Sequence, residues 1–286
     1  MIDWDSELQT ASKRLLSSDT APNLVESIQY SLLSAGKYFR PRLMEASANL
    51  FELPHATFIP FAIALEMIHS FTLIHDDLPC MDDDDFRRGK PSNHKVYGEA
   101  LALLAGDALV PMAFENCLQS LQHVDPLSWK SAFTRLLDVS GPRGVIGGQA
   151  LEMLIHKQNS LQKLREMHAL KTGALFDAAI LIPADLSPIK PSTEQFKALS
   201  AFSKRFGLAF QTADDLDDAA RERDPKTGTY PGTSVLHYLS FESAQKQASD
   251  ELDESMRELQ RLWPKSSQSL IEISRQLHRS LKATHP

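Results

Sequence analysis

Apolar residues recur along most of the chain at the spacing expected for one face of a helix. Phe61, Leu65 and Ile68 follow steps of three and four residues, and the stretches 98–121 and 196–218 show the same periodicity. No clear alternation of apolar and polar residues is present, and glycine is scarce, with 12 residues among 286. The pattern therefore predicts helices throughout the chain and no substantial sheet.

The predicted helices are separated where proline and glycine cluster. These clusters lie at 36–41, 89–91, 141–148, 183–191 and 225–232. The chain has no repeat of fixed period and no low-complexity segment, so nothing in it indicates an array or a linker between domains. Typical helix lengths then predict one all-α domain over residues 1–286, a bundle of roughly ten or more helices.

Charge and composition exclude several classes of partner. The 37 acidic residues exceed the 30 basic ones and give a net charge of −7, which argues against a nucleic-acid partner. The most apolar stretch, 58–74, is interrupted by Glu66 and His69, so we expect no membrane span. The two cysteines, Cys80 and Cys117, are too few for a disulfide framework. An acidic N-terminus without the order of a signal peptide completes the expectation of a cytoplasmic protein.

Two dense clusters of aspartates carry the candidate chemistry. The first occupies residues 76–85, and the second occupies residues 214–218. In the second, Asp214 and Asp218 are four residues apart and share a helix face. In the first, Asp76 and Asp82 are six residues apart, and the proline between them must distort a helix.

Aspartates at this density repel one another and raise one another's pKa values unless a cation neutralises them. Carboxylates combined with diphosphate oxygens suit Mg²⁺, which keeps part of its water shell and bridges to substrate phosphates. A single cluster is equally well explained as a solvated acidic helix end. Two clusters, each following an apolar helix, favour a site that holds a diphosphate through metal ions.

A diphosphate also needs cationic side chains, and three short segments offer them. Lys37 and Arg40 lie in the first segment, Arg87 and Arg88 directly follow the first aspartate cluster, and Lys171 lies in the middle of the chain. Arginine forms forked hydrogen bonds with phosphate, whereas lysine supplies a point charge. Any one of them alone would be read as a surface cation, but the pair beside the aspartates is more specific.

These segments together resemble a known family. GKYFRP, DDLPCMDDDDFRRGKPSNHK, KTG and FQTADDLDD are similar, in this order from residue 36 to residue 231, to the motifs of trans-isoprenyl diphosphate synthases. The nearest groups are the bacterial farnesyl diphosphate synthases and the bacterial and plant-type geranylgeranyl diphosphate synthases. The resemblance implies an all-helical isoprenoid-synthase fold with a central active-site cavity, and a homodimer. It also implies a prenyltransferase that condenses dimethylallyl or geranyl diphosphate with isopentenyl diphosphate to give farnesyl diphosphate.

The resemblance also implies roles for individual residues. Three Mg²⁺ ions, with Mn²⁺ as the alternative, would be held by Asp76, Asp77, Asp82, Asp214, Asp215 and Asp218. The allylic diphosphate would contact Arg87, Lys171, Thr172 and Gln211. Isopentenyl diphosphate would contact Lys37, Arg40, His69 and Arg88. The catalytic set would be Asp76, Asp77, Asp82, Lys171, Asp214 and Asp215.

Two residues before the first aspartate cluster are expected to limit the length of the product. In the similar enzymes the fifth residue before the first aspartate matters most, and here it is Phe71, a bulky residue that resembles farnesyl synthases. Ideal helix geometry instead places Thr72, four residues before Asp76, on the same face as that aspartate. Both residues are therefore candidates for the wall of the product cavity.

One segment departs from the family pattern. Related bacterial enzymes have a longer loop after the second cluster, with a lysine three residues before a tyrosine. Here Thr227 occupies that position relative to Tyr230, and Lys226 is displaced by one residue. We expect Lys226 to contact the substrate only if the shortened loop brings it within reach.

Other functions remain as alternatives. The chain could instead be a geranylgeranyl or geranyl diphosphate synthase, which would use the same motifs. A terpene cyclase would need an aspartate-rich site but neither the second DDxxD nor the GKxxRP segment. A non-catalytic helical partner of another synthase would be expected to lose aspartates or cations that this chain keeps. A simple metal-binding helical protein would not need the cations.

Overall fold

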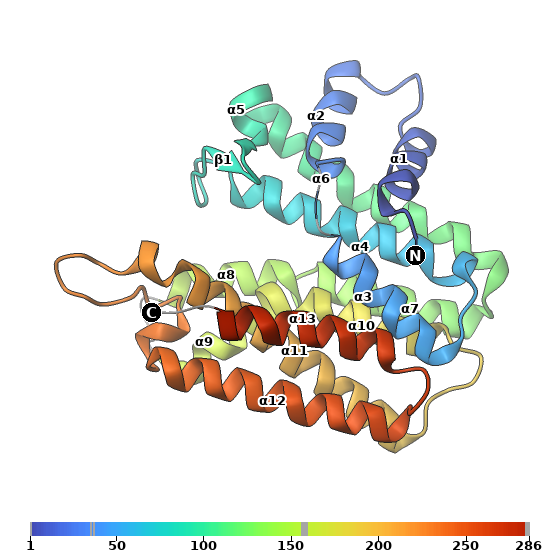
Figure 1. Cartoon of the computed structure of the whole chain (residues 1–286). Helices are drawn as coiled ribbons and strands as arrows, with labels where there is room; N and C mark the ends of the chain where they lie inside the picture. Colours follow the sequence, from blue (N-terminus) through green and yellow to red (C-terminus); the bar gives the residue numbers. More distant parts are fainter. Residues whose placement is uncertain (1, 35, 37, 156–159, 284–286) are drawn as a thin grey trace. The chain divides into compact units, whose positions relative to one another are not determined.

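The computed structural model describes residues 2–34, 36, 38–155 and 160–283. The prediction of an all-α fold is confirmed, because these residues form thirteen α-helices and one hairpin of two-residue strands (Figure 1). Contacts within the chain divide it into two compact units. Unit 1 comprises residues 1–45 and 54–129, and unit 2 comprises residues 46–53 and 130–286. The expected single domain with a central cavity stays a prediction.

Unit 1 is built around the pair α4 and α6, which lie side by side (Figure 1). Asn116 of α6 ties the pair together by donating a hydrogen bond of 2.7 Å to the carbonyl of Pro60 in α4. The elements of this unit are α1 Trp4–Leu15, α2 Pro22–Leu32, α4 His55–Asp76, β1 Phe86–Arg87, β2 Lys90–Pro91, α5 Asn93–Tyr97, α6 Glu99–Cys117 and η2 Leu118–His123.

Unit 2 is built around the long helix α11, which packs against α10 and α12. Its start is fixed by a capping box, in which the Ser192 side chain accepts from the Gln195 backbone and the Gln195 side chain accepts from the Ser192 backbone. The elements of this unit are η1 Asn49–Phe51, α8 Val145–Ile155, α9 Leu161–His168, η3 Ala169–Gly173, α10 Ala174–Leu186, α11 Thr193–Glu222, η4 Val235–His237, α12 Phe241–Leu262 and α13 Gln268–Ala283. Two helices, α3 Phe39–Ala48 and α7 Pro126–Ser140, contribute residues to both units.

The breaks predicted from proline and glycine lie near helix ends in the structure, although the clusters at 36–41 and 141–148 extend into α3 and α8. The cluster at 183–191 spans the end of α10 and the connection to α11, and the cluster at 225–232 follows α11. The cluster at 89–91 is the exception, because it forms a hairpin that the periodicity did not indicate. Arg88 and Gly89 both have positive φ there, 53° and 76°, as the two central residues of a tight type I′ turn require.

Among the described residues, two stretches are long and apolar enough, by length and composition alone, to cross a membrane. They are His55–Asp76 and Glu99–His123, and 78% and 44% of their most apolar windows are buried inside the protein. Core helices of globular proteins pass the same test, and α4 is such a helix, since Phe58, Phe61 and Leu65 are almost fully buried. The expected absence of a membrane span stays a prediction.

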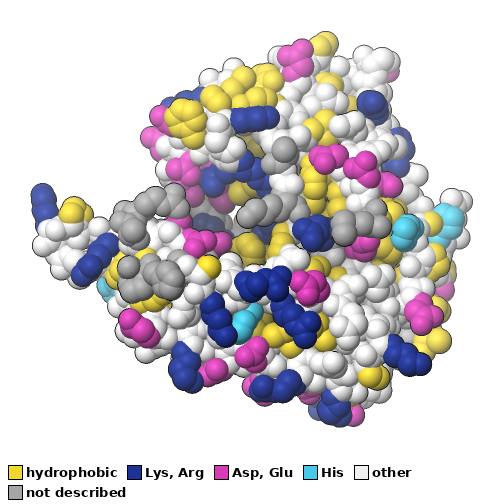
Figure 2. Space-filling model, viewed as in Figure 1, with side chains coloured by type: hydrophobic (Ala, Val, Ile, Leu, Met, Phe, Trp, Pro, Cys, Tyr) yellow, Lys and Arg dark blue, Asp and Glu magenta, His cyan; other side chains and the backbone are white. Residues whose placement is uncertain are grey.

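Charges of both signs alternate on the outer helices of unit 2. Figure 2 shows basic and acidic side chains interspersed over the surface formed by α12 and α13. Lys246 pairs with Asp250 at 2.6 Å, and Arg279 pairs with Glu272 at 2.9 Å. This part of the surface therefore lacks the continuous basic face that nucleic-acid binding requires.

Candidate active site

The first aspartate cluster lies where α4 ends. The helix stops at Asp76, as expected from the proline at position 79, because the residue before a proline is disfavoured in helical geometry. The chain then loops back, and the backbone N–H of Asp82 donates to the carbonyl of Asp76 at 2.8 Å. The loop therefore brings residues 76 and 82 together although six positions separate them in sequence.

Asp77 differs from its neighbours because it is buried, with 3% of its surface exposed. The Arg87 side chain donates to its Oδ1 atom through Nε at 2.8 Å and also through Nη2. The same guanidinium donates to Asp84 at 2.7 Å. Burial raises the pKa of Asp77, and the Arg87 charge opposes that shift. The structure thus uses Asp77 to position Arg87, which stays partly exposed beside the cluster.

Arg88 lies in the turn of the hairpin and reaches back over the chain at Gly36. Its Nη1 donates to the Ser34 carbonyl at 3.4 Å, and a Cβ added at Gly36 would lie 2.8 Å from that atom. Glycine at position 36 therefore leaves room for the guanidinium. Lys37, which the sequence placed with this group, lies outside the described residues.

A buried acid that sequence reasoning did not include stands among these cations. Glu66 of α4 has 3% of its surface exposed, and burial raises its pKa while Arg40 and Arg88 oppose that shift. Desolvation, followed by the charges of Arg40, Arg88 and Arg87, lowers the pKa of His69 well below its usual value. Three cations of unit 1 thus act on the same stretch of α4, and His69 is neutral at pH 7. An acidic residue inside the apolar run 58–74 was the sequence signal for Glu66.

The second cluster stands on α11, which continues past it without a break. Asp214 is exposed and Asp218 half-buried, whereas Asp215 is buried, with 7% of its surface exposed. Asp215 accepts a hydrogen bond of 2.7 Å from the backbone N–H of Val235 and one of 2.9 Å from Gln211 Nε2. It therefore anchors the start of η4 to α11, while positions 214 and 218, four residues apart, share a face of the helix.

The KTG segment forms a single π-helical turn, Ala169–Gly173, inside a continuous helical run from α9 to α10. Such turns widen the helix by one residue and are frequent at functional sites. Thr172 donates to Gln211 Oε1 at 2.7 Å, so two residues assigned to the same substrate meet in unit 2. Lys171 pairs with Glu152 of α8, a partner that the sequence motifs did not reveal.

Two glycines allow this turn to lie close to its neighbours. A Cβ added at Gly148 of α8 would lie 2.2 Å from the Lys171 backbone nitrogen. A Cβ added at Gly207 of α11 would lie 2.9 Å from the Gly173 Cα atom. Both contacts involve backbone, which cannot rotate away as a side chain can. Only glycine fits at these positions without moving the segment.

Comparison with known proteins assigns the chain to a family. The family model described as polyprenyl synthetase matches residues 21–229, a range that contains both aspartate clusters and the KTG turn. The chain belongs to the polyprenyl synthetase family. The resemblance drawn from the motifs is thereby confirmed.

Relatives of this chain carry different product names. It is 35% identical over 269 residues to a farnesyl diphosphate synthase of Bacillus subtilis, which covers 90% of this chain and 87% of that protein. It is 40% identical over 203 residues to geranylgeranyl pyrophosphate synthase 7 of Arabidopsis thaliana. That match covers 70% of this chain and 58% of the plant protein, so the chain spans less than two thirds of that relative.

Solved structures of similar proteins agree on the fold. A geranyltransferase of Legionella pneumophila superposes with a TM-score of 0.87 at 30% identity, covering 99% of this chain and 96% of that one. An enzyme of Zymomonas mobilis titled FPP/GFPP synthase superposes with a TM-score of 0.84 at 32% identity, covering 96% and 95%. The all-helical architecture is therefore that of this family.

The two candidate wall residues lie on different faces of α4. Phe71 is buried and meets the ring of His75 edge to face, with 5.7 Å between the ring centres. His75 in turn contacts α6, through the Leu103 carbonyl at 3.1 Å and against Gly106. Thr72 is half-buried and donates to the His69 carbonyl at 2.8 Å. Phe71 therefore shares the face of α4 that meets α6, whereas Thr72 shares the face of Asp76.

Lys226 lies in the exposed loop that follows α11. The Asp224 side chain accepts from the backbone N–H groups of Lys226, at 2.7 Å, and Thr227, at 3.3 Å, which holds this part of the loop as a tight turn. Arg223 Nε donates to the carbonyl of Gly228 at 3.1 Å and closes the loop further. The shortened loop thus has its own internal support, and the role of Lys226 stays a prediction.

Proposed function

We propose that this chain is a prenyltransferase that condenses dimethylallyl and geranyl diphosphate with isopentenyl diphosphate and releases farnesyl diphosphate. The observation that carries the proposal is the design shared by the two aspartate clusters. In each, the second aspartate is buried and anchors a neighbour, while the flanking pair stays accessible: Asp76 with Asp82, and Asp214 with Asp218. Family membership supports the same reaction class.

The donors fit Mg²⁺, because both accessible pairs consist of carboxylates alone, which suit a hard cation that shares its shell with phosphate oxygens and water. Asp76, Asp82, Asp214 and Asp218 would hold the ions directly. Asp77 and Asp215 would act mainly by anchoring Arg87 and η4. Mg²⁺ bound there would act as a Lewis acid on the departing diphosphate.

The remaining side chains have separable tasks. Arg87, Lys171 and Thr172 would bind the allylic diphosphate, and the Asp77 and Gln211 contacts would orient Arg87 and Thr172 for that purpose. Arg40 and Arg88, with Lys37, would hold isopentenyl diphosphate. His69, kept neutral by its surroundings, would donate a hydrogen bond to that substrate rather than add another charge.

Apolar residues would protect the allylic cation from water. Phe210 lies one turn before Asp214 on α11, and its ring packs against Phe176 with 4.8 Å between ring centres. An aromatic face at this position would exclude water and stabilise positive charge. The proton lost after condensation would leave with the released diphosphate, so no protein nucleophile is required.

A geranylgeranyl or geranyl product is the second candidate, because named relatives include geranylgeranyl as well as farnesyl synthases. The test is incubation of the purified protein with Mg²⁺, isopentenyl diphosphate and, in turn, dimethylallyl, geranyl and farnesyl diphosphate. Mass spectrometry then identifies the products. A dominant farnesyl product supports the proposal, a geranylgeranyl product keeps the reaction and changes the product, and no product from any primer refutes the activity.

The product wall is tested by two matched truncations. If Phe71 limits growth, Phe71→Ala shifts the main product to a longer chain and Thr72→Ala leaves it unchanged. If Thr72 limits growth, the two results are exchanged.

The family further suggests a homodimer in the cytoplasm, and the exposed Leu103 and Leu104 on α6 are compatible with a covered face there. Sedimentation of the purified protein tests the dimer.

A further inference from the structure

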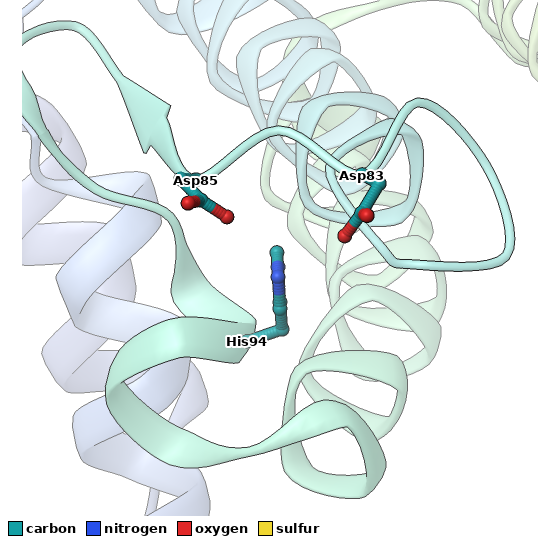
Figure 3. Close-up of side chains that lie close together, drawn as sticks. All are labelled: Asp83, Asp85 and His94. Atoms are coloured by element: carbon teal, nitrogen blue, oxygen red, sulfur yellow. The ribbon is translucent and has the colours of Figure 1, made fainter.

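The first aspartate cluster contains more acidic residues than the proposed reaction uses. The side chains of these additional residues contact different neighbours. Asp84 points to Arg87, at 2.7 Å, together with the buried Asp77. Its neighbours Asp83 and Asp85 instead lie close to His94 of α5 (Figure 3). One ligand atom from each of these three residues lies within 4.8 Å of the others. Asp83, Asp84 and Asp85 thus belong to two separate groups of residues.

His94 is the decisive member of this second group. It has 6% of its surface exposed, and its ring rises between the two carboxylates (Figure 3). The Nδ1 atom is 3.2 Å from the Ser92 hydroxyl. The Nε2 atom is buried, and no hydrogen-bond partner lies within reach of it among the described residues. A buried ring nitrogen without a partner costs free energy, so its surroundings need an occupant.

We propose that Asp83, Asp85 and His94 form a binding site for a divalent transition-metal ion such as Zn²⁺, separate from the sites proposed for Mg²⁺. Imidazole with two carboxylates is a donor set for borderline metals, whereas Mg²⁺ prefers oxygen alone. The contact of Ser92 with Nδ1 matches the usual arrangement in metal sites, where the second ring nitrogen is held and the first binds the ion.

The geometry requires only small movements. Ligands about 2.1 Å from a tetrahedral zinc ion lie about 3.4 Å apart, so the three groups, now within 4.8 Å of one another, must approach by up to about 1.4 Å. Asp83 and Asp85 are exposed and can turn, while His94 is held in place by burial. The Lys95 ammonium pairs with Asp85 at 2.7 Å. That ammonium occupies part of the position of a cation and must leave when the ion binds.

The ion would join the loop at the end of α4 to the start of α5. The backbone already supports this connection, since the Ser92 N–H donates to the Asp85 carbonyl at 2.9 Å. A metal bridge would stiffen the loop that carries Asp82. This inference goes beyond the proposed function, because binding at this site needs neither substrate nor turnover.

The test is calorimetric titration of the full-length protein with Zn²⁺ in a large excess of Mg²⁺ and without diphosphates. The excess Mg²⁺ competes for the all-carboxylate positions, so that the titration reports the proposed zinc site. Because no diphosphate is present, the result does not depend on catalytic activity. We expect one zinc site, weakened at least tenfold by Asp83→Asn and by Asp85→Asn. Asparagine is a close match for Asp83, whose φ of 53° it adopts readily. Asp84→Asn, the same change between the two, should leave the affinity unchanged.

Two further variants sharpen the result. Lys95→Gln removes the competing cation and should tighten zinc binding. His94→Gln should weaken it, and the asparagine variants carry the test if that buried change prevents folding. Absorption spectra with Co²⁺ in place of Zn²⁺ separate this site from binding by the exposed Cys80 thiol, which would give a thiolate band. The proposal is overturned if the wild-type protein binds no zinc, if Asp83→Asn binds it unchanged, or if the spectrum shows a thiolate ligand.

Discussion

The two aspartate clusters present similar carboxylates on very different supports. The first lies where a helix ends, and a looped segment returns Asp82 to the backbone of Asp76. The second lies within a helix that runs on through it, so that Asp214 and Asp218 share a face by helical geometry alone. In both clusters the second aspartate is buried and accepts a hydrogen bond from a neighbour. The donor is the Arg87 side chain in the first cluster and the Val235 backbone N–H in the second.

The difference teaches where each cluster obtains its rigidity. In the first, a charged side chain holds the loop, so the arrangement depends on an ion pair between Asp77 and Arg87. In the second, a buried carboxylate accepts from a backbone N–H and a side-chain amide, so the arrangement depends on a short hydrogen-bond chain through Gln211 to Thr172. The outer aspartates of each cluster are exposed or half-buried, while the inner ones are buried.

The largest expected effect separates the outer aspartates from their neighbours. Under the proposed function, Asp76→Asn and Asp214→Asn should each lower kcat/KM about a hundredfold to a thousandfold, because each would remove charge that stabilises the leaving diphosphate. The exposed Asp217, beside Asp218 but outside the pair, is the control, and Asp217→Asn should change the rate only a few-fold. Steady-state kinetics with geranyl and isopentenyl diphosphate measure the effects. Equal losses in all three variants would contradict the pairing.

Acidic pH should destabilise the segment next to the second cluster, because His168 becomes protonated. Its Nε2 is 3.0 Å from the carbonyl of Thr233, two residues before Val235, and burial lowers its pKa from 6.5 to about 4. Between pH 4 and pH 6.5 the native state therefore binds fewer protons than the unfolded state. Stability is complete above pH 6.5 and falls by up to about 3 kcal/mol as the pH drops to 4.

Urea unfolding at several pH values measures that slope. His168→Gln keeps a donor for the Thr233 carbonyl but cannot titrate, so its slope between pH 6.5 and pH 4 should be smaller. An identical slope in the variant would place the acid sensitivity elsewhere in the chain.

Two glycines that contact different parts of the candidate site should differ in their tolerance of substitution. Gly148→Ala places a methyl group against the Lys171 backbone and should cost about 1–3 kcal/mol or more in the free energy of unfolding. For Gly106→Ala in α6, the three nearest atoms belong to the ring of His75, which can rotate away at the loss of its contact with the Leu103 carbonyl, so the change should cost less. Denaturant unfolding of both variants makes the comparison, and a larger loss for Gly106→Ala would reverse it.

The smallest effect distinguishes inner from outer positions within the second cluster. Asp215→Ala leaves the Val235 N–H and the Gln211 amide without their acceptor and should cost about 1–2 kcal/mol of stability. Asp214→Ala should stay within about 0.5 kcal/mol, because its side chain is exposed. Unfolding curves of the two alanine variants supply the measurement. Equal stabilities would show that the inward contacts contribute little.

The fold class followed directly from the sequence, because helical periodicity and the punctuation by proline and glycine are local properties. The pairing of Asp214 with Asp218 followed for the same reason, since a helix fixes residues four apart. The return of Asp82 to Asp76 could be anticipated only in part. The proline predicted a distortion of the helix, but the hydrogen bond that closes the loop depends on how the intervening residues fold.

Partners from distant segments were beyond sequence reasoning. Nothing local indicated that Glu152 would meet Lys171, or that His94 would lie beneath two aspartates of the first cluster. Motif resemblance named Asp77 and Asp215 together with their neighbours and could not separate inward from outward carboxylates. That distinction depends on burial, which only the packing of α4 and α11 against other elements decides.

The π turn at Ala169–Gly173 also fixes how far α9 is rotated about its axis relative to α10. Because the turn holds one residue more than an α-helical path would, every side chain of α9 is rotated by about 100° relative to α10 from where an unbroken helix would put it. Removing a single residue there would restore an ordinary helix and turn α9 away from its present neighbours. The chain therefore tolerates no change of length at this point, even though the segment contains no fully buried side chain.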